Sequence, residues 1–147
     1  MPDFDRPIRT DRHDDAAMIA GEIAKKKAIP DHIMASPARR TMQTAKLFCT
    51  EWEIKYKSVE TAESLYEGSA ENILTVINGI EDKFDMVAII CHNPSVTYFI
   101  NQYSDGRIDN VPTTGAAFIS FDVKHWQEIS GGGKLKWFLY PKSLKGK

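Results

Sequence analysis

Residues 86–100, MVAIICHNPSVTYFI, carry the clearest fold signal in the chain. The apolar run from Met86 to Cys91 predicts a buried strand that stops at His92. Asn93 and Pro94 follow, and the apolar residues after them have helical spacing, so a helix is expected to begin near Pro94. A buried strand that ends at a polar side chain and leads into a helix is typical of an α/β fold.

Residues 31–45, DHIMASPARRTMQTA, follow the same plan. DHIMAS predicts a short strand, and Ser36 and Pro37 suit the N-cap and the first turn of the next helix. Arg39 and Arg40 fall in that first turn, where a cation opposes the helix dipole and costs roughly 0.3–1 kcal/mol. A helix selected only for stability would carry acidic residues there.

Both strand ends point to one functional edge of the sheet. In open α/β sheets, ligands bind at the carboxyl ends of the strands, where helix N-termini favour anions. A guanidinium group binds phosphate with two hydrogen bonds, so Arg39 and Arg40 predict an oxyanion site together with His92. Solvated arginines and a packed histidine would explain the same residues, and this alternative stays open at this stage.

The rest of the chain alternates strands with helices. A helix is expected over residues 11–27, and Ser69 suits the cap of another; strands are expected over residues 53–59, 116–123 and 134–141. This order predicts a three-layer α/β/α fold with a mainly parallel sheet, in one domain of residues 1–147.

Composition excludes several classes of partner. With 19 basic and 20 acidic residues, the chain has no general attraction to nucleic acid or to an anionic membrane. It has no apolar run of about 18 residues and no signal peptide at its start. Cys49 and Cys91 lie far apart and are expected to be free thiols, which suits a reducing cytoplasm. No zinc-ligand spacing or cofactor motif is present.

Several motifs in order resemble the histidine phosphatase superfamily, whose fold is phosphoglycerate mutase-like. SPARRTMQTA is similar to its Ser-Pro-x-x-Arg-Ala-x-Gln-Thr-Ala signature, and CHNPSV resembles its Gly-His-Asn-Pro motif. DFDRPI, VPTTGAAFISFD and YPKSL resemble more narrowly the SixA-like phosphohistidine phosphatases. The resemblance spans nearly the whole chain.

The resemblance implies a site and a mechanism. In this family a histidine attacks the phosphoryl group, a covalent phosphohistidine forms, and water hydrolyses it without a metal. The alignment implies catalytic and phosphate-binding roles for Arg40 and His92. It also implies a substrate-binding position for Asn93, which could help hold the loop, and Arg39, in a variable position, is a further substrate-binding candidate. It also suggests Glu67 as proton donor, although an acidic surface residue is the simpler explanation of Glu67.

One family element has no match in these 147 residues. The family opens with an apolar strand that ends in Arg-His, and this strand precedes the DFDRP segment; here the chain begins at Met1. His13, His32 and His125 are not expected to replace the nucleophile. Three explanations stay open: a natural start further upstream, a shortened chain, or a gene that has lost the strand. The first is favoured, because loss of a central strand would expose strand edges and destabilise the domain. A chain without this strand is expected to be unstable, or to complete its sheet by association into a homo-oligomer.

The leading prediction is therefore a phosphatase in its full-length form. Its substrate would be phosphohistidine on a signalling protein, or a small phosphoester, and phosphate, vanadate or sulfate would bind in the site. The alternative is a non-catalytic relative that binds phosphate or a phosphoprotein and lacks the nucleophile.

Overall fold

The computed structural model describes residues 10–66 and 68–145. The elements, in chain order, are α1 (Thr10–Lys25), β1 (His32–Ala35), α2 (Arg39–Trp52), η2 (Tyr56–Ser58), β2 (Glu60–Thr61), η3 (Glu63–Leu65), α3 (Ala70–Asn78), β3 (Val87–Ile90), α4 (Ser95–Tyr103), β4 (Ala116–Ser120), η4 (Trp126–Glu128), β5 (Lys134–Leu139) and α5 (Pro141–Lys145). Elements labelled η are short 3₁₀ helices. The predicted alternation of strands and helices is confirmed.

The strands form two separate sheets. One has the order β2-β1-β3 and is parallel throughout, with Ala35 opposite Ile90. The other is the antiparallel pair of β4 and β5. Within the described residues β3 pairs only with β1, so β3 and β4 each have an edge without a partner strand.

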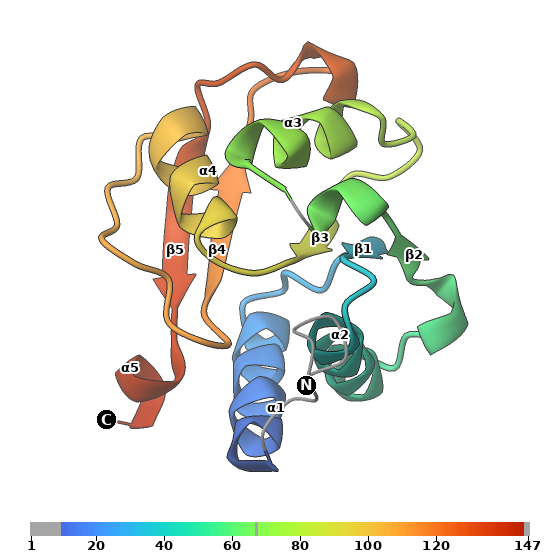
Figure 1. The fold of residues 1–147 in the computed structure, drawn as a ribbon, viewed down its shortest axis with the longest axis vertical. Helices are drawn as coiled ribbons and strands as arrows, with labels where there is room; N and C mark the ends of the chain where they lie inside the picture. The colour runs from blue at the N-terminus through green and yellow to red at the C-terminus, as the bar shows by residue number, and fades with distance from the viewer. Residues whose placement is uncertain (1–9, 67, 146–147) are drawn as a thin grey trace.

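Helices cover both faces of the strands (Figure 1). One core contains α1 and α2, and strand residues Ala88, Ile90, Ala116 and Phe118 pack against it. The other contains α3 and α4 and takes Val87, Ile89 and Cys91 from the β3 segment, as well as Ile119 and Phe121. Both sheets therefore lie in one layer between two helix layers, which confirms the predicted α/β/α arrangement.

Neighbouring strands differ sharply in burial. Ile33, Met34 and Ala35 of β1 are 2%, 7% and 0% exposed, because β1 has strands on both sides. Every residue of β3, an equally apolar strand, is only half-buried. The same holds for all of β4. A parallel strand covered on both faces is normally buried, so β3 and β4 are less fully covered than β1 by the described residues.

Two local predictions are wrong. Residues 53–59 do not form a strand; Ser58 donates from both its N–H and its Oγ to the Lys55 carbonyl, which closes the short turn η2. Only Glu60 and Thr61 then pair with β1. Ser36 does not cap α2, whose N-cap is Ala38 without a side-chain bond. The Ser36 Oγ instead accepts from the Ala38 N–H at 3.3 Å, in the turn that leads into α2.

Cys49 and Cys91 are free thiols, as predicted. Burial raises the pKa of both, that of Cys91 to about 12. None of the helices in the described part of the chain is long and apolar enough to span a bilayer.

We expect both cysteines to resist modification by Ellman's reagent at pH 8 in the folded chain. A thiol with a pKa of about 12 is ionised only to ~10⁻⁴ at that pH, and the thiolate is the reactive form. Absorbance at 412 nm should rise only after urea is added. Rapid reaction of one native thiol would show that Cys49 or Cys91 is accessible in solution, contrary to this prediction.

Candidate functional site

The ends of β1 and β3 lie side by side. The ladder is parallel, and the Ser36 N–H donates to the Ile90 carbonyl at 2.9 Å. The segments that begin at Ser36 and at His92 therefore leave the sheet at adjacent positions of one edge. This is the arrangement that the two sequence motifs predicted.

The helices after these two strands differ from α3. Neither α2 nor α4 has a side-chain cap or an acidic residue in its first turn. In α3, Ser69 accepts from the Asn72 N–H at 3.2 Å and Glu71 lies in the first turn. No acidic side chain therefore offsets the positive end of α2 or α4 in its own first turn, which favours an external anion.

Arg39 and Arg40 are the first two residues of α2. Arg39 is exposed and Arg40 is half-buried. Neither guanidinium forms an ion pair with a carboxylate among the residues that the structure describes. The positive charge of Arg40 is therefore available at the helix N-terminus beside the end of β1.

His92 is half-buried and follows β3 after one residue, Cys91. Its ring meets the Tyr66 ring edge-on, with 5.9 Å between the centroids and 62° between the planes. The Ser95 Oγ donates to the His92 carbonyl at 2.8 Å and holds the backbone of the loop. In the described structure the imidazole nitrogens have no hydrogen-bond partner, so both remain available to a ligand.

Asn93 connects this loop to two neighbouring segments. Its Nδ2 donates to the Val111 carbonyl and, at 3.3 Å, to Asn110 Oδ1. Its Oδ1 accepts from the Thr97 Oγ1 at 2.8 Å and from the Thr97 N–H at 3.3 Å. The side chain thus ties the loop after β3 to α4 and to the segment before β4, and a role of Asn93 in substrate binding stays a prediction.

Thr97 and Val111 complete this network and were not singled out in the sequence. The Thr97 Oγ1, besides donating to Asn93, accepts from the Val111 N–H at 3.0 Å, and both residues are 5% exposed. The only sign of this hydrogen-bond network in the sequence is a threonine, Thr97, inside an apolar helical pattern. The pairing itself joins residues 14 apart and could not be read from local spacing.

The other three histidines do not lie at these strand ends. His32 opens β1 at the opposite edge, where its ring stacks on Phe84 at 4.2 Å and its Nε2 lies 3.2 Å from Glu60 Oε1. His125 lies 2.9 Å from Asp82 at the start of η4, and this hydrogen bond lowers the pKa of Asp82. His13 is exposed on α1.

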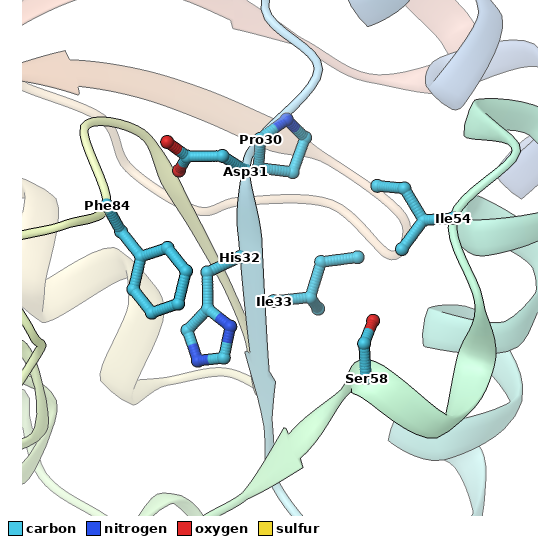
Figure 2. Close-up of a pocket in the computed structure, with 7 residues that line it drawn as sticks. All are labelled: Pro30, Asp31, His32, Ile33, Ile54, Ser58 and Phe84. Carbon is cyan, nitrogen blue, oxygen red and sulfur yellow. The ribbon is translucent and has the colours of Figure 1, made fainter.

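Two surface hollows lie elsewhere. The first, about 410 Å³, is shown in Figure 2, where His32 and Phe84 line one side and Ile33, Ile54 and Ser58 the other. It lies at the amino end of β1. The second, about 790 Å³, includes Asn110, the partner of Asn93, and Arg107, Phe138, Tyr140 and Lys142. Neither is lined by Arg40 or His92.

The predicted proton donor is the remaining site residue. Glu67 lies outside the described residues, so its role as proton donor stays a prediction.

No group of three His, Cys, Asp or Glu residues able to hold a metal occurs in the described ranges 10–66 and 68–145.

Solved structures show which fold this is, whereas no family model and no curated protein matches the chain significantly. The protein histidine phosphatase SixA complexed with tungstate matches with a TM-score of 0.82 and 22% identity, over 97% of this chain and 89% of that one. A protein assigned as phosphohistidine phosphatase SixA from Agrobacterium tumefaciens matches with 0.77 and 23%, over 96% and 87%. One from Nakamurella multipartitia matches with 0.76 and 20%, over 96% and 88%. The chain therefore has the α/β/α fold of the SixA phosphohistidine phosphatases.

Proposed function

We propose that this chain binds a phosphoryl group at the ends of β1 and β3 and carries most of a metal-independent phosphatase site. The observation that carries the proposal is the pairing of Arg40 and His92 at adjacent strand ends. Each lies beside a helix N-terminus without an acidic residue in its first turn. One neighbour of the same fold is complexed with tungstate, a phosphate-like oxyanion.

In the proposed reaction a histidine nitrogen attacks the phosphorus atom, and the bond to the leaving group breaks with its electron pair. Water then attacks the phosphohistidine, which releases inorganic phosphate and restores the imidazole. Arg40 and His92 would donate hydrogen bonds to the phosphoryl oxygens as negative charge develops on them. Glu67 is a candidate for protonating the leaving group, and Arg39 for a second contact.

The nucleophile is not assigned to any of the four histidines. The unpaired edge of β3 leads directly to His92, so a parallel strand paired with that edge would end beside this loop. The full-length enzyme would place its nucleophilic histidine at the end of such a strand. Phosphohistidine on a protein, or a small phosphomonoester, is the proposed substrate; a chain without this strand would bind phosphate or a phosphoprotein without turnover.

We expect tungstate and inorganic phosphate to bind the 147-residue chain in isothermal titration calorimetry, and Arg40→Ala to weaken binding at least tenfold. One charged hydrogen bond is worth about 1.5–3 kcal/mol, which is that factor or more. Lys46→Ala is the control, because it removes one positive charge from an exposed position of the same helix, away from its first turn; a change below about threefold is expected. Equal losses for both variants would indicate general charge attraction and contradict the site.

The catalytic and the non-catalytic forms differ in one further measurement. Incubation with a phosphohistidine peptide or p-nitrophenyl phosphate, followed by acid and base treatment, tests for a phosphoenzyme that is labile to acid and stable to base. Its formation supports the covalent mechanism in the chain tested. Anion binding without a phosphoenzyme supports the phosphate-binding form.

A further inference from the structure

The larger of the two surface hollows, about 790 Å³, lies next to the loop that carries His92. Its lining comes from the loop between α4 and β4 and from the segment that runs from the end of β5 into α5 (Figure 1). One lining residue, Asn110, accepts through its Oδ1 from Asn93 Nδ2 at 3.3 Å, and Asn93 directly follows His92. A ligand that extends beyond a phosphoryl group at His92 is therefore placed to enter this hollow.

The Arg107 side chain in this hollow is held in a fixed orientation. Its Nη1 donates to the Gly106 carbonyl at 2.7 Å and to the carbonyls of Asn101 and Ser104, each at 3.4 Å. These contacts use the Nη1 donors alone. The donors on Nη2 and Nε form a planar fork, and a fork held in place in this way suits a carboxylate.

The other lining side chains supply a second cation and an aromatic surface. Lys142 of α5 is exposed, as Arg107 is. Phe138 and Tyr140 are half-buried, with 5.2 Å between their ring centroids and 42° between the planes. Asp109 is the acidic residue in the described lining. Two cations against one carboxylate favour an anionic ligand, and the two rings offer apolar contact to the same ligand.

We propose that this hollow binds an acidic segment of a protein whose phosphoryl group lies at Arg40 and His92. Arg107 and Lys142 pair with aspartate or glutamate side chains, and the aromatic pair packs against apolar groups of the same segment. Charge complementarity of this kind discriminates between partners and speeds the association of the right one.

A protein segment fits this arrangement better than a small phosphoester does. Arg40 and His92 are not part of the described lining of the hollow. A ligand that reaches both places must therefore pass the contact between Asn93 and Asn110. An extended polypeptide adds about 3.3–3.6 Å per residue and can occupy both, whereas a small phosphoester fills only the first. The inference rests on the proposed function for the phosphoryl end alone, and binding of the acidic segment can be measured without a phosphoryl group.

NMR titration of the ¹⁵N-labelled 147-residue chain tests the proposal. The probe is the unphosphorylated peptide Gly-Asp-Glu-Phe-Glu-Asp-Gly. We expect it to shift the amide signals of Asn110, Tyr140 and Ser143, which line the hollow, and to leave that of Thr75 on the exposed side of α3 unchanged. The matched peptide with Asn and Gln in place of Asp and Glu should bind at least about tenfold more weakly, because it forms no ion pairs.

Charge-changing variants locate the binding energy. Lys142→Gln and Arg107→Gln should each weaken binding of the acidic peptide about threefold, the effect of one exposed ion pair, whereas Asp109→Asn should strengthen it about twofold. Lys142→Gln changes an exposed side chain and leaves the packing of the fold intact. The control is Lys134→Gln at the other end of β5, where a change below about 1.5-fold is expected.

Three outcomes would overturn the proposal: equal binding of the acidic and the neutral peptide, equal losses for Lys142→Gln and Lys134→Gln, or no shift at the hollow with millimolar peptide. A parallel titration with tungstate separates this result from the proposed function. Peptide binding without tungstate binding supports the acidic-segment site and contradicts the phosphoryl site. Tungstate binding without peptide binding contradicts the acidic-segment site alone.

Discussion

Ile33→Ala should lower the free energy of unfolding by about 3–4 kcal/mol, the largest effect expected of any substitution considered. Ile33 is 2% exposed in the central strand β1, where strands lie on both sides and helices α1 and α2 cover its face. Truncation of a fully buried isoleucine removes its transfer free energy and leaves a cavity, at a cost of about 2–5 kcal/mol. Urea denaturation followed by circular dichroism measures the loss.

Ile89→Ala is the matched control for this experiment. It makes the same change in the neighbouring strand, where Ile89 lies opposite Met34 and is only half-buried. The surrounding side chains and water can adjust at the open edge, so a loss of about 1–2 kcal/mol is expected. Equal losses in the two variants would show that β3 is packed as fully as β1 in solution, contrary to the structure.

Asn93→Ala is expected to cost about 2–3 kcal/mol of stability and also to weaken tungstate binding. The substitution removes the donors to Val111 and Asn110 and the acceptor for Thr97. Val111 and Thr97 are each 5% exposed, so their polar groups lose partners where little water can replace them, at about 1–3 kcal/mol for each group left unpaired. The loop that carries His92 would then be free to move.

Asn110→Ala provides the comparison. It removes one exposed contact at 3.3 Å from the same network and should change stability by less than about 0.5 kcal/mol. Thermal denaturation and calorimetric titration of both variants separate the two effects. An Asn93→Ala chain with unchanged stability and unchanged tungstate affinity would remove Asn93 from the supporting role described for it.

Sequence reasoning reached the parts of the fold that have a local signal. The strand before His92, the strand before Ser36 and the cap at Ser69 follow from apolar runs and cap residues. The adjacency of the two strand ends followed from the parallel order that alternating elements impose.

The failures share one physical cause, which is that tertiary contacts decide where local signals are weak. Tyr56 and Ser58 alternate with lysines as a strand would, yet no partner strand reaches them and the segment closes into η2. The network around Asn93 joins three segments that are separate in sequence, so local residue spacing cannot predict these hydrogen bonds.

The alternation of side chains along β4 has a consequence for cooperativity. Ala116 and Phe118 on one face pack against the core of α1 and α2, and Ile119 and the following Phe121 on the other face pack against that of α3 and α4. One short strand is therefore shared by both hydrophobic cores. Unfolding of either core removes β4 side chains from contact with the other core. We therefore expect the two cores to unfold in one cooperative transition rather than one after the other.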